Sequence, residues 1–116
     1  MTNVVPTDPV PYALMGFARP KPGRVEELKE LLLSFVAPTR VEEGALEYHF
    51  HEDADDPSTF VFYEVWRSKE DLDRHLSLPY MRDFWEHRMD YLEQDLDIRF
   101  LSMQSPYPRP VPAIAV

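Results

Sequence analysis

The sequence TFVFYEVW, residues 59–66, decides the fold of this chain. Alternate side chains of a β-strand point to opposite faces of its sheet, and here both faces are apolar apart from one glutamate. One face carries Phe60, Phe62, Glu64 and Trp66, and the other carries Val61, Tyr63 and Val65. Such a strand belongs to a sheet that must be covered on both sides.

The sequence on either side of this strand supplies the rest of the sheet. Apolar alternation predicts further strands at 12–19, 46–52 and 96–103. Residues 53–58, DADDPS, form turns readily and connect two of the strands as a hairpin.

Helical periodicity separates the remaining strands. An apolar stripe begins at Arg24, is kinked or restarted by Pro38, and ends at Gly44 as a C-terminal cap. Ser68 caps a short second helix, and Pro79 begins another helical piece. The order predicts an α+β, ferredoxin-like βαββαβ protomer, with an antiparallel four-stranded sheet and helices on one face.

The second face of the sheet needs a different cover. Because the helices cover only one apolar face, we expect a copy of the same sheet on the other, which gives a homodimer through the sheet faces. A monomer at micromolar concentration in sedimentation or light scattering would contradict this expectation.

Composition excludes several classes of protein. The chain has 116 residues and no cysteine, so we expect one domain without disulfides, thiolate zinc sites or cysteine nucleophiles. The net charge of −9 argues against binding to nucleic acid. No apolar run approaches the roughly eighteen residues that span a membrane, and the N-terminus does not resemble a secretory signal. We expect a cytoplasmic protein.

Prolines mark both ends of the chain. Their density predicts extended arms at 1–11 and 104–116 around a domain at 12–103. The C-terminal arm is either a loose tail or a segment exchanged with a partner subunit, since Val111, Ile114 and Val116 are apolar.

One pair of histidines has the spacing of a metal site. His49 and His51 share a strand face with Glu47 and could hold a divalent metal. Further ligands are missing from the pattern, and the alternative is a polar patch at the strand end. We expect no metal.

Glu64 is a carboxyl in the middle of an apolar strand. Either it forms an ion pair, with Arg40, Arg88 or Arg99 within reach, or it has a raised pKa and serves as a proton acceptor. Trp66 lies on the same face, and its indole N–H requires a partner.

His75 and Tyr48 are two further candidates. His75 lies near the edge of the apolar stripe of the short helix, so it either points into a pocket over the sheet or is partly exposed. Tyr48 faces inward, either as a core tyrosine or as a donor to a ligand oxygen.

These residues lie in segments that together resemble a known family. KPGRVEELKELL (21–32), TRVEEGALEYHF (39–50) and FVFYEVWRSKEDLDRHL (60–76) contain Glu42-x-Gly44-x-x-x-Tyr48 and Glu64-x-Trp66 followed by His75. In this order and spacing the chain resembles the antibiotic biosynthesis monooxygenase family of dimeric α/β barrels, which includes small quinol monooxygenases.

The resemblance implies a pocket between sheet and helices in each protomer, in which a quinol or polycyclic phenol is oxidised by molecular oxygen without a cofactor. Carried over to this sequence, Glu64 or His75 is the base, Trp66 and Phe84 wall an aromatic cage with Phe62 as a further substrate contact, and Tyr48 or Arg40 donates to the oxyanion. The base would create a carbanion-like anion that can give an electron to oxygen, and the donor would stabilise the developing charge.

Three other functions remain open at this point. Relatives of this fold isomerise keto compounds, and one branch degrades haem with the help of an asparagine on the first strand, where Gly16 stands here. The third alternative is a non-enzymatic small-ligand-binding or accessory dimer, in which Glu64 is a structural ion pair. An open cavity lined by Glu64, Trp66 and His75 would favour an enzyme.

Overall fold

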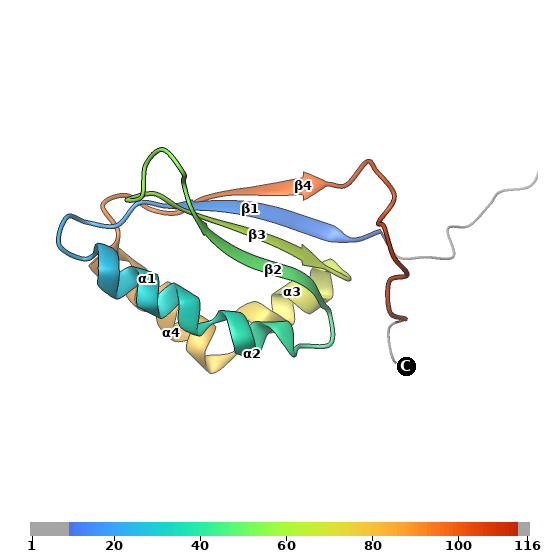
Figure 1. Ribbon diagram of the computed structural model, residues 1–116. Helices are drawn as coiled ribbons and strands as arrows, with labels where there is room; N and C mark the ends of the chain where they lie inside the picture. The colour runs from blue at the N-terminus through green and yellow to red at the C-terminus, as the bar shows by residue number, and fades with distance from the viewer. Residues whose placement is uncertain (1–9, 114–116) are drawn as a thin grey trace, which may run out of the picture.

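The structure is a computed structural model that describes residues 10–113. Figure 1 shows a sheet with all of the helices packed under one face. The strands are β1 (Tyr12–Ala18), β2 (Ala45–Glu52), β3 (Phe60–Trp66) and β4 (Asp97–Ser102). Their order is β2-β3-β1-β4, and each neighbouring pair is antiparallel. The predicted α+β, ferredoxin-like arrangement is confirmed, with the decisive strand β3 in the interior of the sheet.

The helices begin and end close to the predicted positions. They are α1 (Val25–Ser34), α2 (Val36–Arg40), α3 (Lys69–Leu76) and α4 (Pro79–Tyr91). Pro38 lies in the first turn of α2, where backbone N–H groups have no acceptor within the helix. The missing N–H of proline therefore costs no hydrogen bond there, and the chain can restart its helix. None of the helices within residues 10–113 combines the length and apolar character needed to cross a membrane.

Ser68 and Gly44 are two predicted helix caps that the structure tests. The Ser68 hydroxyl accepts a hydrogen bond from the backbone N–H of Asp71 at 3.2 Å, which confirms the predicted cap of α3. The prediction that Gly44 caps a helix is wrong, because α2 ends at Arg40 and Gly44 has no positive φ. A Cβ built on Gly44 would instead overlap the side chain of Asp71, so this glycine permits a close contact between two segments.

The core lies between the sheet and the helices. Strands and helices both contribute apolar side chains that are almost completely buried: Leu14, Phe60 and Trp66 from the sheet, and Leu28, Leu32, Leu72, Met81 and Phe84 from the helices. Gly16 on β1 pairs with Phe62 on β3, and a Cβ built on Gly16 would overlap the Phe62 ring. The absence of a side chain at Gly16 therefore places the Phe62 ring over β1, on the side of the helices.

The other face of the sheet carries no helix (Figure 1). The C-terminal segment passes one end of the sheet, where the Tyr107 hydroxyl donates to Glu47 at 3.2 Å and Arg67 Nη1 donates to the carbonyl of Ala113 at 3.1 Å. These contacts lie within the chain. Ile114 and Val116, which the arm-exchange hypothesis uses, lie outside the described residues, as does most of the N-terminal arm. The homodimer through this face stays a prediction.

Candidate functional site

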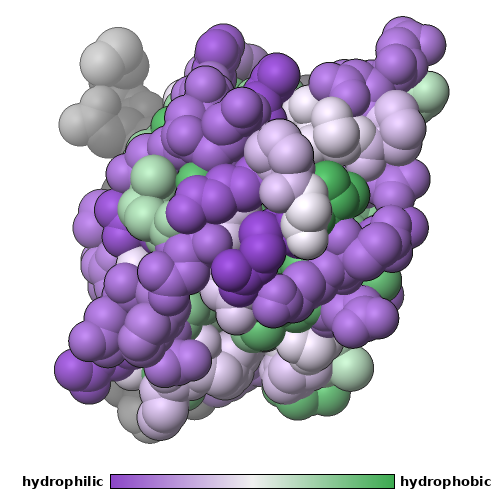
Figure 2. Space-filling view, turned by 90° about the vertical axis from the view of Figure 1, so that its left-hand side faces the viewer, coloured by the Kyte–Doolittle hydropathy of each residue, from purple (hydrophilic) through white to green (hydrophobic). Residues whose placement is uncertain are grey.

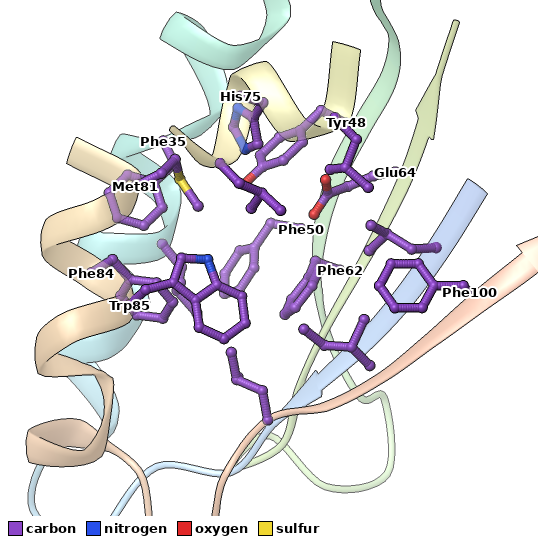
Figure 3. A pocket seen from close by; sticks show the side chains of 16 residues that line it. Phe35, Tyr48, Phe50, Phe62, Glu64, His75, Met81, Phe84, Trp85 and Phe100 are labelled. Carbon is purple, nitrogen blue, oxygen red and sulfur yellow. The ribbon is translucent and has the colours of Figure 1, made fainter. Parts of the chain in front are cut away.

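A cavity of about 200 Å³ lies between the helix-covered face of the sheet and the helices (Figure 3). Its walls are mainly apolar and aromatic, and the residues labelled in the figure are Phe35, Tyr48, Phe50, Phe62, Glu64, His75, Met81, Phe84, Trp85 and Phe100. The three polar side chains, Tyr48, Glu64 and His75, gather at one end, and aromatic rings line the other. The mouth lies beside β4, because Phe100 is 60% exposed although it lines the cavity.

Glu64 brings a carboxyl to this cavity from the middle of β3. It is 6% exposed, and one of its oxygens accepts a hydrogen bond from the indole Nε1 of Trp66 at 2.9 Å. Burial raises the pKa of Glu64 to about 7, the hydrogen bond from Trp66 opposes this effect, and the charge of Glu42 adds to it. Near neutral pH both the protonated and the ionised form of this carboxyl are therefore populated.

The ion-pair interpretation of Glu64 is wrong. Arg88 forms a bidentate pair with Asp95 at 2.8 and 3.0 Å. Arg99 contacts Asp97 at 3.3 Å, and Arg40 donates to the backbone carbonyl of Tyr48 at 3.0 Å. Arg40 and Arg99 are exposed and Arg88 is partly exposed, so burying any of these guanidinium groups beside Glu64 would cost solvation that they retain in their present positions.

His75 projects from α3 to the same end of the cavity. It is 1% exposed, so the alternative of a partly exposed histidine is wrong. Its Nδ1 lies 2.7 Å from Glu42 Oε2, and its buried Nε2 has no hydrogen-bond partner in the described part of the chain. Burial lowers the pKa of His75, and the hydrogen bond and charge of Glu42 oppose that effect.

Tyr48 lies between these two groups in the close-up view (Figure 3). Burial, and after it the charge of Glu64, raises the pKa of Tyr48 above its usual range. The phenol therefore keeps its proton at neutral pH and can donate a hydrogen bond. Its ring meets the His75 ring edge-on, with centroids 5.9 Å apart.

Two predicted site residues do not line the cavity. Arg40 is exposed on the surface, where it contacts the backbone of Tyr48 and the His49 ring, so the structure does not bring this predicted oxyanion donor to the cavity. Trp66 does not wall the cage either. It is completely buried behind the cavity, where its ring packs 4.7 Å from the ring of His75 and its N–H binds Glu64. The space beside Glu64 and His75 is closed by this indole, which leaves Trp66 a supporting position.

The histidine pair of β2 lies away from the cavity. His49 Nε2 lies 3.2 Å from Glu47 Oε1, and the exposed His51 lies near the backbone carbonyl of Val61. Within residues 10–113 no group of three or more potential metal-ligating side chains comes together.

Sequence reasoning missed part of the site. Phe62 and Phe84 line the cavity as predicted, but Phe35, Met81, Trp85 and Phe100 line it as well. Helical spacing already places Phe35, Met81 and Trp85 on inward faces, although it does not show that they leave a hollow. The sequence pointed to Glu42 only as part of the Glu42-x-Gly44-x-x-x-Tyr48 motif. Its contact with His75 joins residues 33 positions apart, which no local pattern indicates.

Comparisons with known proteins agree with this architecture. The family model described as antibiotic biosynthesis monooxygenase matches residues 11–87. The protein sll1783 of Synechocystis is 36% identical over 89 residues, which is 77% of this chain and 60% of that protein. The chain therefore spans about 60% of the length of this relative.

Two further proteins are similar over most of their length. Rv0793 of Mycobacterium tuberculosis, whose name proposes a monooxygenase, is 32% identical over 74 residues, covering 64% of this chain and 72% of that protein. The crystal structure of PA3566 from Pseudomonas aeruginosa superposes with a TM-score of 0.77 at 30% identity and covers 83% of this chain and 96% of that one. On the family match and the shared fold, this chain belongs to the antibiotic biosynthesis monooxygenase family.

Proposed function

We propose that this chain is a monooxygenase that oxidises a quinol or polycyclic phenol with molecular oxygen inside the cavity, without a bound cofactor. Membership in the family and the names of two relatives support a monooxygenase-like function. The observation that carries the proposal is the Glu64 carboxyl, which is buried at the edge of an aromatic cavity without a cationic partner among the described residues.

The cavity has the size and lining for an aromatic ligand. An apolar cavity of about 150 Å³ is known to bind benzene, and the cavity here measures about 200 Å³. Phe62, Phe84 and Trp85 present rings to its interior (Figure 3). Among the described residues that line it there is no lysine or arginine, so a phosphate or carboxylate group on the ligand would be buried without a counter-charge. The cavity therefore favours a neutral substrate over a phosphorylated keto compound.

Glu64 supplies the proton acceptor of the proposed reaction. The keto tautomer of the phenol or quinol carries a CH2 carbon. The ionised carboxylate removes one proton from this carbon, and the electron pair stays on the substrate as a carbanion-like anion. That anion transfers an electron to molecular oxygen, and the resulting radicals combine to form a carbon–oxygen bond. The peroxide takes up the proton from Glu64, its oxygen–oxygen bond breaks, and the carbon loses its second hydrogen. One oxygen atom remains as a carbonyl and the other leaves as water, so the substrate is itself the reductant.

Tyr48 and His75 lie where charge develops on substrate oxygen. The phenol of Tyr48 retains its proton, so it can donate to an oxyanion at the polar end of the cavity. Because the surroundings are apolar, a hydrogen bond made there is stronger than one made in water.

Oxygen uptake tests the proposal directly. Metal-stripped protein is mixed with a panel of hydroquinones and anthrones, and uptake is compared with that of the variants Glu64→Gln, His75→Ala and Trp66→Phe. Glu30→Gln is the matched control, because Glu30 is exposed on α1. We expect uptake that Glu64→Gln lowers about 100-fold or more, the usual contribution of a general base, and that Glu30→Gln leaves unchanged.

Two outcomes would contradict the proposal. Equal rates for the wild type and Glu64→Gln would remove the role of Glu64. Tight binding of the panel compounds without oxygen uptake would favour the alternative of a small-ligand-binding or accessory protein. Haem titration with no Soret shift would close the haem-degrading alternative.

A further inference from the structure

The contact between His75 and Glu42 determines which ring nitrogen of His75 carries the proton. His75 Nδ1 lies 2.7 Å from Glu42 Oε2, which is the distance of a charge-assisted hydrogen bond. An ionised carboxylate can only accept hydrogen bonds, so the proton of this contact must lie on Nδ1. A neutral imidazole carries one N–H, which leaves Nε2 with a free lone pair.

Nε2 is the atom that the fold leaves unpaired. This atom is buried and has no hydrogen-bond partner among residues 10–113, and His75 as a whole is only 1% exposed. Buried polar atoms are almost always hydrogen-bonded, so an unpaired one at the wall of a cavity indicates a partner supplied by a ligand. The pKa of His75 is lowered by burial, which keeps the ring neutral and its lone pair available at neutral pH.

The Glu42 oxygen that contacts His75 also accepts a second hydrogen bond. The Tyr80 hydroxyl, which comes from α4, donates to Glu42 Oε2 at 3.3 Å. Thr39 Oγ1, on α2, lies 3.1 Å from the same hydroxyl and is completely buried. The chain Thr39, Tyr80, Glu42, His75 therefore connects α2, α4 and α3 through hydrogen bonds. This arrangement fixes the carboxylate against which the imidazole is oriented.

We propose that Glu42 is a positioning residue that holds His75 with its proton on Nδ1, so that Nε2 accepts a hydroxyl proton of the substrate. This inference rests on the proposed function and extends it. The negative charge of Glu42 would stabilise the imidazolium that forms when Nε2 takes up the proton. The titratable groups facing His75 are Glu42, Tyr48, Glu64 and Tyr80.

The substrate must therefore have two sites that can each lose a proton. Nε2 of His75 and the Glu64 carboxyl lie at one end of the cavity, on either side of Tyr48 (Figure 3). A hydroxyl proton can pass to His75 while a carbon-bound proton passes to Glu64, and His75 returns its proton to the substrate oxygen once the peroxide has broken down. The site therefore favours aromatic substrates that carry a free hydroxyl, and a methyl ether in place of that hydroxyl removes the group that Nε2 binds.

Nitrogen-15 NMR of the full chain tests the tautomer without any activity measurement. We expect the wild-type spectrum to show His75 with the proton on Nδ1 and an unprotonated Nε2, with the exposed His51 and His87 as internal references. In Glu42→Gln we expect the pKa of His75 to fall and the opposite tautomer to become populated, because an amide can donate to Nδ1. Glu30→Gln should reproduce the wild-type spectrum. A wild-type proton on Nε2 would overturn the inference.

Oxygen uptake as a function of pH gives the second readout. We expect Glu42→Gln to lower kcat about 10- to 100-fold, as is typical for residues that orient a functional side chain, and to move the acidic limb of the profile to lower pH. Tyr80→Phe keeps the carboxylate, so it should retain the tautomer and lose less activity; it replaces Glu42→Gln if that variant does not fold. An unchanged profile in both would overturn the positioning role. Failure of the proposed function would appear differently, as absent uptake with the tautomer intact.

Discussion

Replacing Glu64 by glutamine should make the protein more stable at alkaline pH and remove part of its pH dependence. The carboxyl is buried in the native state, and burial raises its pKa from 4.5 to about 7. In the unfolded chain it titrates near its ordinary value. Between these two values the native state binds more protons than the unfolded state, so the free energy of unfolding falls as the pH rises through this window.

The magnitude follows from the two pKa values. Each unit of difference corresponds to about 1.4 kcal/mol, so a displacement from 4.5 to about 7 makes native Glu64 about 3 kcal/mol less favourable above pH 7. Glutamine has no charge to bury, and its carbonyl can still accept the hydrogen bond from Trp66 Nε1. We therefore expect the stability of Glu64→Gln relative to the wild type to increase by about 2 to 3 kcal/mol between pH 5 and pH 8.

Urea denaturation at fixed protein concentration, followed by far-UV circular dichroism at several pH values, measures this difference. Tryptophan fluorescence is the wrong probe here, because Trp66 contacts Glu64 directly. Burial lowers the pKa of His75, but this histidine is present in both proteins, so the difference between them isolates Glu64. Glu30→Gln should show no pH-dependent difference from the wild type. A flat difference between Glu64→Gln and the wild type from pH 5 to pH 8 would refute the argument that Glu64 is buried without a cation.

Three further changes test the packing that surrounds the site, each by urea denaturation. Gly16→Ala should destabilise the fold by about 1 to 3 kcal/mol because its methyl group overlaps the Phe62 ring, and combining it with Phe62→Ala should recover part of the loss. Arg67→Met should cost about 3 kcal/mol, since it leaves the buried Asp71 without its bidentate partner; a neutral result would show that Arg74 suffices. Ser68→Ala should cost about 1 kcal/mol through loss of the α3 cap, and an unchanged midpoint would contradict that role.

Local sequence patterns predicted the fold well because neighbouring residues produce them. The alternation in residues 59–66 identifies β3 and its two faces without knowledge of any other segment. Pro38, Ser68 and Pro79 act within one helical turn of their own positions, and each lies where a helix begins. Gly44 is the exception. Its role is a close contact with Asp71, a residue distant in the sequence, so local reasoning assigned it wrongly.

The sequence predicted only part of the site, again because local patterns do not show which distant residues meet. Sequence alone identified Glu64 as a carboxyl on an apolar face, and it identified His75 and Tyr48 as inward candidates. Whether an arginine neutralises Glu64 depends on where the chain brings each guanidinium, and Arg40 has other partners on the surface. A sequence pattern predicts the type of a side chain and the face on which it lies, but it does not predict which of several possible partners that side chain will contact.

The sequence by itself determined the order of the strands and helices, the two apolar faces of β3, and the presence of a carboxyl among them. The tertiary structure decided that the helices leave a cavity against the sheet, that Trp66 supports this cavity from behind, and that Glu42 meets His75 across 33 residues. The physical reason is the distance along the sequence over which each effect acts. Periodicity and capping depend on residues within a turn or a strand, whereas burial, desolvation and hydrogen-bond partnership arise only when distant segments pack together.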